Sequence, residues 1–206
     1  MAKFEVCCHK WADLSEHNYG VSILNDSKYG FATCGNMMRL SLLRAPKAPD
    51  AHADMGRHHI RYAVMPHSGS LDYRTVRAGY NFNNPLILQP ASGNEDRNIF
   101  NSVNVHGSES LILDCIKRGE DDEDVSRGEL AVRPGRSIIL RVYEALGGKS
   151  RGHIAVAPTL SVKKTFKCNV LEDDTEEIEL PEPTSNGLII PIELRAFEVA
   201  TYRLQL

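Results

Sequence analysis

The chain has 206 residues, 42% of them hydrophobic and 25% charged, with a formal net charge of −3. These proportions are typical of a folded globular protein and exclude a disordered chain. The slightly acidic charge also argues against a nucleic-acid or membrane-surface partner, since such partners favour a concentrated basic patch.

The first segment of the chain and its cysteines limit where the protein could act. Residues 1–10 lack the uninterrupted apolar core of a signal peptide, and no apolar run of about 18 residues occurs. An odd set of cysteines without a CxxC pair argues against a disulfide framework and against zinc binding by thiolates. We therefore expect reduced thiols that serve as small core hydrophobes, at Cys7, Cys8, Cys34, Cys115 and Cys168.

Short segments of alternating or β-branched apolar residues, separated by Gly, Pro, Asn and Asp, dominate the sequence and predict strands. No long segment has a convincing helical period. The pattern predicts an all-β fold, a sandwich or a barrel. In chain order the predicted strands cover residues 23–24, 38–42, 61–65, 103–105, 111–113, 138–142, 154–156 and 197–199.

Three polar stretches interrupt the strands. Residues 89–98 are rich in Pro, Ser, Gly and charge, which indicates a linker between a β unit at 1–92 and a smaller one at 93–206. Residues 119–128 and 172–179 are acidic, and like charges at that density favour solvated surface loops. Neither acidic run has the ordered spacing of a calcium loop, so no calcium site is expected.

One polar turn combines the groups that sugar recognition needs. Its members Asn25, Asp26, Lys28 and Tyr29 are an amide, a carboxylate, an ammonium and a phenol between two predicted strands. Such a set offers hydrogen-bond donors and acceptors to sugar hydroxyls. An ordinary polar hairpin, with Asn and Asp chosen for backbone geometry, explains the same residues, and composition alone favours it.

A second polar segment, residues 52–59, holds Asp54 and His58 beside further histidines. The spacing permits a metal site, but a glycine and a predicted loop intervene, so a polar loop leading into the next strand is the favoured interpretation. No GxSxG, P-loop, GxGxxG or HExxH motif occurs in the sequence, and no carboxylate pair stands out. The residues alone therefore predict neither a catalytic group nor a bound metal.

Four runs in the first half of the chain are long and specific: HKWADLSE at 9–16, YGVSILNDSKYG at 19–30, LSLLRAPKAPD at 40–50 and ADMG at 53–56. They resemble the late region of class II α-mannosidases, glycoside hydrolase family 38, and are most similar to its cytosolic and vacuolar branch. Ser27 stands where many relatives have cysteine. The likeness covers residues 3–82 and then thins, although residues 141–145 and the terminal strand still fit.

The resemblance implies that residues 1–92 end a β-supersandwich-like domain and that residues 93–206 form a C-terminal β-sandwich. The whole enzyme would remove terminal α-D-mannose with retention, which requires two carboxyl groups about 5 Å apart. In the family these groups, and the ligands of zinc or another divalent metal, belong to an N-terminal domain that this chain lacks. No catalytic or metal-binding residue is expected here.

The resemblance also implies a supporting role for the polar segments. Asn25, Asp26, Lys28 and Tyr29 would form a wall of the sugar pocket, with Asp54 and His58 as secondary candidates. The implied partners are α-mannosides, the missing catalytic domain and further copies of the enzyme, in the cytoplasm or the vacuole.

Two other functions remain open. A free-standing carbohydrate-binding module is disfavoured by an aromatic content of only 7% with a single tryptophan, because such modules need an exposed aromatic platform. A pure interaction domain would instead use strand edges that truncation leaves exposed.

Overall fold

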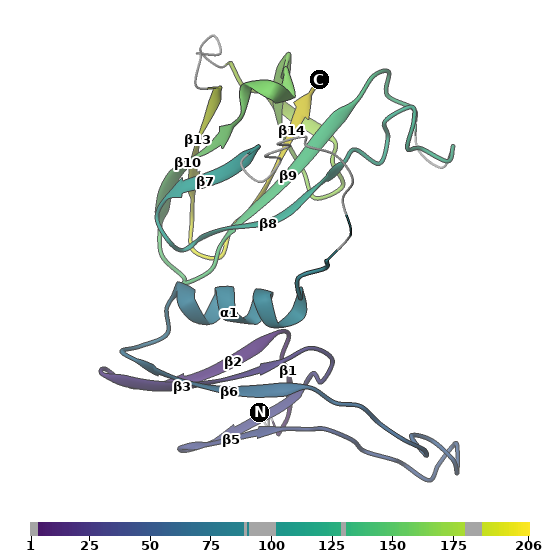
Figure 1. The fold of residues 1–206 in the computed structure, drawn as a ribbon, viewed down its shortest axis with the longest axis vertical. Coiled ribbons are helices and arrows are strands. Elements are labelled where there is room, and N and C mark those ends of the chain that lie inside the picture. Colours follow the sequence, from purple (N-terminus) through teal and green to yellow (C-terminus); the bar gives the residue numbers. More distant parts are fainter. Residues whose placement is uncertain (1–3, 89, 91–101, 129–130, 180–186) are drawn as a thin grey trace. The chain divides into compact units, whose positions relative to one another are not determined.

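Strands are the dominant regular secondary structure of the computed structural model, which describes residues 4–88, 90, 102–128, 131–179 and 187–206. The elements fall into two compact units, Met1–Ala91 and Ser92–Leu206, each with its own sheets (Figure 1). The all-β fold class predicted from the sequence is confirmed. The predicted linker at 89–98 lies almost entirely outside the described residues.

The first unit contains two three-stranded antiparallel sheets. One has the order β2-β3-β6 and the other the order β1-β4-β5. Leu24 of β3 pairs with Trp11 on one side and with Ala63 on the other, so β3 is the central strand of its sheet. The strands are β1 (Val6–Cys7), β2 (Trp11–Ser15), β3 (Tyr19–Asn25), β4 (Gly30–Cys34), β5 (Met37–Leu40) and β6 (Tyr62–Ser68).

The expectation of no long helix is wrong for residues 73–83, which form α1 (Tyr73–Asn83) and pack on β2 and β3. The carboxylate of Asp72 caps this helix by accepting a hydrogen bond from the backbone N–H of Arg74 at 2.8 Å. Glycine, asparagine and aromatic residues in the helix have weak helical propensity, so packing on the sheet must stabilise it. Gly79 permits that packing, because a Cβ there would lie 2.7 Å from Cδ1 of Trp11.

A polar cluster is buried between α1 and its sheet. Asp13 Oδ2 accepts a hydrogen bond from Ser22 at 2.5 Å and lies 2.7 Å from His67 Nε2, while Thr75 of the helix lies 3.0 Å from Ser22. Serine and histidine both bind the carboxylate rather than each other, so this group lacks the geometry of a nucleophilic triad. Its hydrogen bonds instead join the helix to three strands of the sheet.

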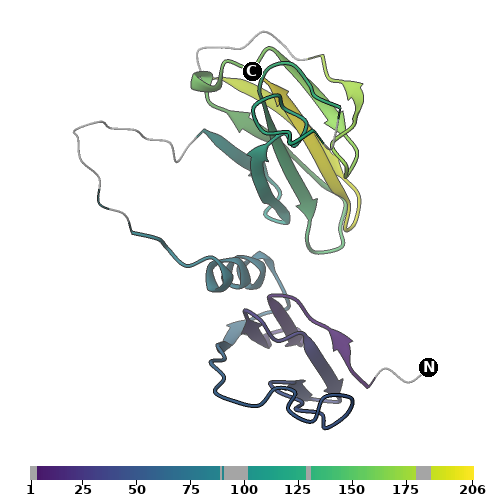
Figure 2. The same ribbon diagram turned by 90° about the vertical axis from the view of Figure 1, so that its right-hand side faces the viewer.

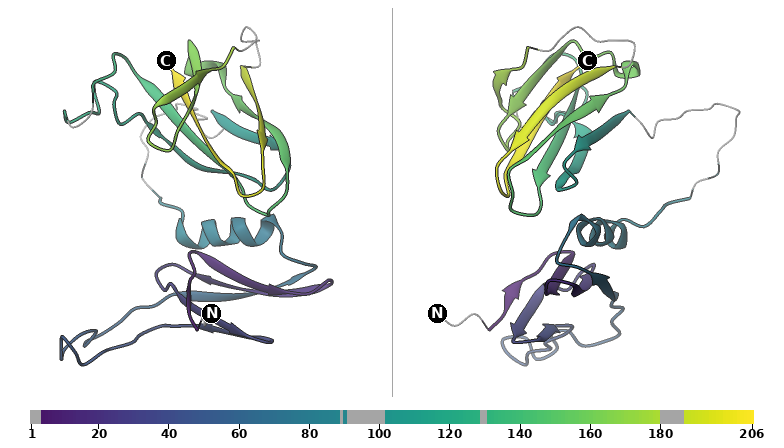
Figure 3. Two further views of the ribbon diagram at one scale, coloured as in Figure 1. Left: turned by 180° about the vertical axis from the view of Figure 1, so that it is seen from behind. Right: turned by 90° about the vertical axis from the view of Figure 1, so that its left-hand side faces the viewer.

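The second unit is a sandwich of two antiparallel sheets. A three-stranded sheet has the order β13-β10-β7 and a five-stranded sheet has the order β12-β11-β14-β9-β8. Figures 2 and 3 show these sheets from further directions. The elements are β7 (Val103–Gly107), β8 (Leu111–Arg118), β9 (Ser137–Glu144), β10 (Ser150–Val156), the 3-10 turn η2 (Pro158–Leu160), β11 (Lys164–Cys168), β12 (Asp174–Glu177), β13 (Leu188–Leu194) and β14 (Val199–Gln205).

Alternation along these strands directs one set of side chains between the two sheets. In β13 every second residue is buried, from Leu188 to Leu194, and the residues between them are exposed. The predicted terminal strand corresponds to β14, which lies in the middle of the five-stranded sheet between β11 and β9. Both sheets contribute to one apolar core, which includes Leu140, Val142, Ile154, Val156, Ile190 and Leu204.

The described cysteines are all free thiols, but they occupy different environments. The prediction of buried thiols holds for Cys8 and Cys168 and is wrong for Cys7 and Cys34, which are exposed. Burial raises the pKa of Cys168 to about 12, so this thiol stays protonated at neutral pH.

No helix within the described parts of the chain is long and apolar enough to cross a membrane.

Candidate functional site

The predicted sugar-binding turn connects β3 to β4 and so passes from one sheet of the first unit to the other. Its first residue, Asn25, is fully buried. The Asn25 side chain accepts a hydrogen bond from the backbone N–H of Lys28 at 3.1 Å, and its backbone carbonyl accepts one from Asn83 of α1 at 2.9 Å. Asn25 therefore shapes the turn, as the polar-hairpin interpretation expects, and its side chain does not reach the surface.

The other members of this turn are accessible. Asp26 Oδ2 lies 3.6 Å from Arg61 Nη1, which belongs to the segment leading into β6. Tyr29 is 48% exposed and stacks on His9, with 4.5 Å between the ring centroids. The surface of the turn thus combines a carboxylate, the ammonium of Lys28 and a stacked aromatic pair. Sequence reasoning missed His9, because only the pairing of the chain beside β4 brings it to Tyr29.

The second candidate segment, residues 52–59, lies in the long loop 41–61 between β5 and β6, which extends well beyond the two sheets of its unit in Figure 1. Ala45 and Asp54 both have left-handed backbones, with φ of 45° and 56°. The Asp54 carboxylate joins them by accepting a hydrogen bond from the backbone N–H of Ala45 at 3.3 Å. His58 Nε2 in turn lies 2.7 Å from the Asp54 carbonyl oxygen.

The Asp54 carboxylate therefore stabilises the backbone of this loop. A non-glycine residue with positive φ is uncommon, and two of them facing each other persist only where neighbouring contacts hold them. Backbone strain of this kind is frequent at ligand sites, so the loop is a candidate ligand site. His58 thus contacts the backbone of Asp54, and one carboxylate oxygen of Asp54 binds the loop itself.

The turn and the loop meet at Arg61, which ends the loop and forms the ion pair with Asp26. Within the described chain, no hydrogen bond or ion pair joins Lys28 or Tyr29 to Asp54 or His58. The described residues also contain no group of three or more His, Cys, Asp or Glu side chains that could hold a metal ion. The segment 52–59 is thus an ordered polar loop in this structure.

A cavity of about 560 Å³ opens between the two sheets of the first unit. Leu14 lines it from β2, Tyr19 and Val21 from β3, and Met38 from β5. Tyr19 is 51% exposed, so the sandwich is incompletely filled at this end. Apolar side chains of another segment would find a complementary surface here.

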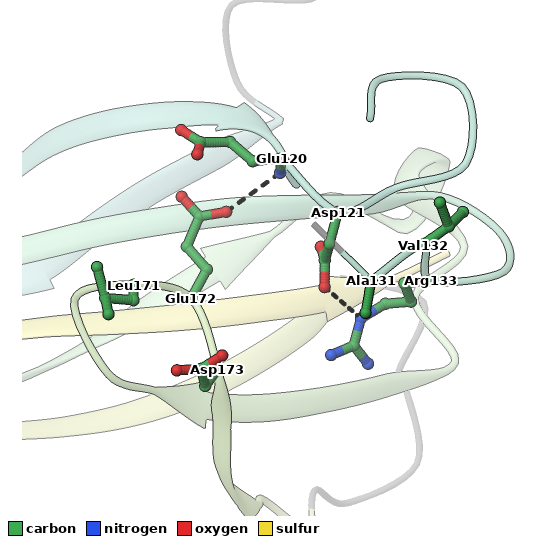
Figure 4. A pocket seen from close by; sticks show the side chains of 8 residues that line it. All are labelled: Glu120, Asp121, Ala131, Val132, Arg133, Leu171, Glu172 and Asp173. Atoms are coloured by element: carbon green, nitrogen blue, oxygen red, sulfur yellow. Dashed lines mark hydrogen bonds and ion pairs between the residues drawn. The ribbon is translucent and has the colours of Figure 1, made fainter. Parts of the chain in front are cut away.

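The second unit has a cavity of about 390 Å³ whose lining is mainly charged, with carboxylates from both predicted acidic loops and one arginine (Figure 4). Asp121 pairs with Arg133 at 3.0 Å, and Glu172 accepts a hydrogen bond from the backbone N–H of Glu120 at 3.2 Å. The expectation of fully solvated acidic loops is wrong here, since Asp122 is 0% exposed and Glu172 is 6% exposed.

The buried carboxylates have cationic partners, since Lys117 pairs with Glu172 at 2.6 Å and Arg118 pairs with Asp122 at 2.9 Å. The guanidinium of Arg203, 1% exposed, binds Asp121 at 2.7 Å and Asp174 at 3.1 Å. Burial alone would raise the pKa of Asp121, but its hydrogen bonds to Arg203 and Arg133 outweigh that effect and lower it. Asp121 and Asp174 are thus committed to ion pairs that hold the unit together, so this cavity is weaker evidence of a ligand site than the first unit's loop.

Two family models match the chain. Residues 1–52 match the model "Glycosyl hydrolases family 38 C-terminal domain", and residues 110–202 match "Glycosyl hydrolases family 38 C-terminal beta sandwich domain".

The curated relatives are longer proteins. The chain is 49% identical over 208 residues to "Alpha-mannosidase" of Saccharomyces cerevisiae, a match that covers 99% of this chain and 19% of the relative. It is 41% identical over 172 residues to "Alpha-mannosidase 2C1" of Homo sapiens, covering 83% and 15%. The chain therefore spans about a fifth of the length of the yeast relative, and its match covers 15% of the human relative.

Two solved structures from Enterococcus faecalis share the fold. One is described as a protein in glycosyl hydrolase family 38, with a TM-score of 0.67 and 16% identity over 98% of this chain and 22% of that one. The other is described as an alpha-mannosidase, with a TM-score of 0.68 and 15% identity over 98% and 21%. At such low identity the likeness concerns the fold alone.

Proposed function

Because the chain belongs to glycoside hydrolase family 38, as its C-terminal region of the class II, cytosolic and vacuolar type, we propose that it is the non-catalytic β region of an α-mannosidase. The whole protein would release terminal α-D-mannose from oligosaccharides with retention, in the cytoplasm or the vacuole. The observation that carries this proposal is the match of nearly the whole chain to one fifth of an α-mannosidase.

The reacting groups would then belong to the rest of the whole protein. Retaining hydrolysis uses one carboxylate as nucleophile and a second carboxyl group as acid and then base, about 5 Å apart. Zinc or another divalent metal would be held there as well. The described residues of this chain offer no set of three ligands for that metal, so the proposal assigns it no residue here.

The contribution of this chain would be a wall of the sugar site. Asp26 and Lys28 supply a hydrogen-bond acceptor and a donor, and the stacked rings of Tyr29 and His9 offer an apolar face to a pyranose. Asp54 would fix the loop 41–61 so that His58 and the other polar groups of the loop keep one position. Asn25 would act only through the shape of the turn.

A second contribution would be assembly. The outward face of β6 exposes Val64 by 62% and Tyr62 by 55%, and the cavity beside Tyr19 is open to further apolar side chains. We assign these surfaces to contacts with the catalytic domain of the same protein and with further copies of it. Apolar area of this kind is stabilising only when a partner covers it.

The purified chain alone should release no mannose from a chromogenic α-mannoside, with or without added zinc or cobalt, because its partner would hold the carboxylate pair. The whole protein should be active in the same assay. Metal-dependent turnover by the chain alone would contradict a non-catalytic role. Retention of the isolated chain on immobilised mannose would instead favour a carbohydrate-binding module, for which the Tyr29–His9 pair is the supporting observation.

In the whole protein, replacing Asp54 with alanine should lower kcat/KM for an α-mannoside by about 10- to 100-fold, since small displacements of positioning groups cost rates of this order. Asp26→Ala and Lys28→Ala should raise KM more than they lower kcat if those residues bind mannose in the ground state. Lys47→Ala, an exposed change in the same loop, is the matched control. Unchanged kinetics in all three variants would rule out the pocket-wall role.

A further inference from the structure

Two histidines face each other across neighbouring strands of the second unit. His106 of β7 is the direct partner of His153 of β10, and their ring centroids lie 5.2 Å apart with 29° between the ring planes. Successive side chains of a strand point to opposite faces of the sheet. Ile154 is fully buried in the core, so its neighbour His153 lies on the outer face. His106 is exposed on that same face.

We propose that His106 and His153 together bind a divalent cation of the late first transition series, such as Ni²⁺, Cu²⁺ or Zn²⁺, with water completing its coordination. Neutral imidazole is the side chain that these ions take most often, and a cross-strand pair presents two imidazoles on a rigid support. The sheet fixes both backbones, so binding would require only rotation of the two rings.

The spacing of the rings fits one shared ion. A metal–nitrogen bond of about 2.0–2.1 Å places the centroid of an imidazole about 3.2 Å from the ion. Two rings bound at a tetrahedral angle then have their centroids about 5.2 Å apart. The separation of 5.2 Å between the stacked rings is therefore compatible with one shared ion once both rings have rotated.

The charged groups on this face set the strength of the site. Glu193 of β13 pairs in register with Arg151, two residues from His153, and its carboxylate forms ion pairs with Arg151 and Lys149. The hydrogen bond from Arg151, followed by that from Lys149, lowers the pKa of Glu193 to about 2, so this carboxylate stays ionised and paired. Because two basic side chains, Lys149 and Arg151, face one carboxylate, Glu193, this group carries a net positive charge. That charge weakens the attraction of a metal cation to the histidine pair.

Within the described part of the chain the site therefore has two protein ligands. Among the described residues no group of three or more potential ligands exists, and Glu193 is already held by its two basic neighbours. A site of two imidazoles and water should exchange its ion freely and should prefer Cu²⁺ over Ni²⁺ and Zn²⁺. Mg²⁺ and Ca²⁺, which require oxygen ligands, should not bind.

Titration calorimetry of the whole chain with Ni²⁺ tests this assignment. We expect saturable binding of one ion per chain at about pH 8, lost at about pH 5, because a protonated imidazole has no lone pair for the metal. In NMR spectra, paramagnetic Ni²⁺ should broaden the ring resonances of His106 and His153 before those of the other histidines. Absence of Ni²⁺ binding at about pH 8 would overturn the proposal.

Matched variants locate the ion. His106→Gln and His153→Gln should each weaken Ni²⁺ binding by at least about tenfold, whereas His17→Gln, at an exposed position of the first unit, should leave it unchanged. His106 is exposed, so its substitution should leave the fold intact, and circular dichroism verifies this. Undiminished binding in His106→Gln, or loss of binding on substitution of His52 or His58 instead, would contradict the assignment.

Discussion

Replacing Arg203 with alanine should lower the free energy of unfolding of the second unit by about 3–5 kcal/mol, the usual cost of removing one partner from a buried ion pair. The side chain is 1% exposed and binds Asp121, Asp174 and Ser137, and also the backbone carbonyl of Glu172 at 2.8 Å. Its loss leaves Asp121 and Asp174 with Arg133 as their one remaining cationic partner among the described residues. Urea denaturation followed by far-UV circular dichroism measures the change.

Two controls make this measurement specific. Trp11 is the only tryptophan of the chain and lies in the first unit, so its fluorescence should report an unchanged transition. Arg136→Ala removes an arginine whose side chain is 69% exposed and pairs with Asp124, and it should cost no more than about 1 kcal/mol. Equal effects of the two arginine substitutions would mean that burial of Arg203 does not matter.

The ion pairs of Arg203 with Asp121 and Asp174 also make the stability of the second unit sensitive to acid. The folded-state pKa of Asp121 is lowered, because its hydrogen bonds to Arg203 and Arg133 outweigh the opposing effect of burial. A carboxyl group with a lowered pKa contributes stability above its unfolded pKa and loses it as the pH falls through the folded value. Acid should therefore destabilise the second unit below about pH 4, and Arg203→Ala should weaken this dependence.

Glu144→Ala should lower the stability of the second unit by about 3 kcal/mol, because its carboxylate serves three backbone donors that have no other partner of similar strength. Its oxygens accept hydrogen bonds from Leu146 at 3.0 Å, from Gly147 at 2.7 Å and from Phe197 at 3.1 Å. The residue is 1% exposed and ties the β9–β10 hairpin to the turn before β14. Hydrogen exchange of these three amides should accelerate first.

Glu144→Gln is the matched variant, because it keeps the shape and one acceptor oxygen. It should lose roughly half as much stability as Glu144→Ala, since its NH₂ group cannot accept a hydrogen bond. Burial alone would raise the pKa of Glu144, but the hydrogen bonds from Phe197, Leu146 and Gly147 outweigh it and lower the pKa. A change below about 1 kcal/mol in the alanine variant would show that water replaces the carboxylate without loss.

Many of the strands, though not β2, β4, β11, β12 or β13, were predicted, because the alternation of apolar and polar residues is local. Residues 138–142 fall within β9, and the predicted strand at 197–199 overlaps the start of β14. Helix α1 was not predictable, since Gly79 and its neighbours disfavour a helix until the sheet supports it. Burial of the acidic loop was equally hidden, because Asp121 and Arg203 are separated by 82 positions.

The candidate site, too, was predictable from the sequence only in part. The sequence correctly suggested polar side chains in the turn, but it could not tell that Asn25 is buried whereas Tyr29 is exposed. Ala45 carries no sign in its side chain that its backbone is left-handed, so the role of Asp54 as its partner appears only in three dimensions. The sugar-binding role of these residues remains a prediction until the kinetic variants are measured.

The central place of β14 has a consequence for synthesis on the ribosome. All its neighbours in the five-stranded sheet precede it in the sequence, so β9 and β11 emerge with their inner edges unpaired. Until residues 199–205 leave the exit tunnel, the nascent chain exposes two strand edges that can pair wrongly with other chains. The five-stranded sheet can therefore close only after β14 has been synthesised, although β9 and β11 are available before it.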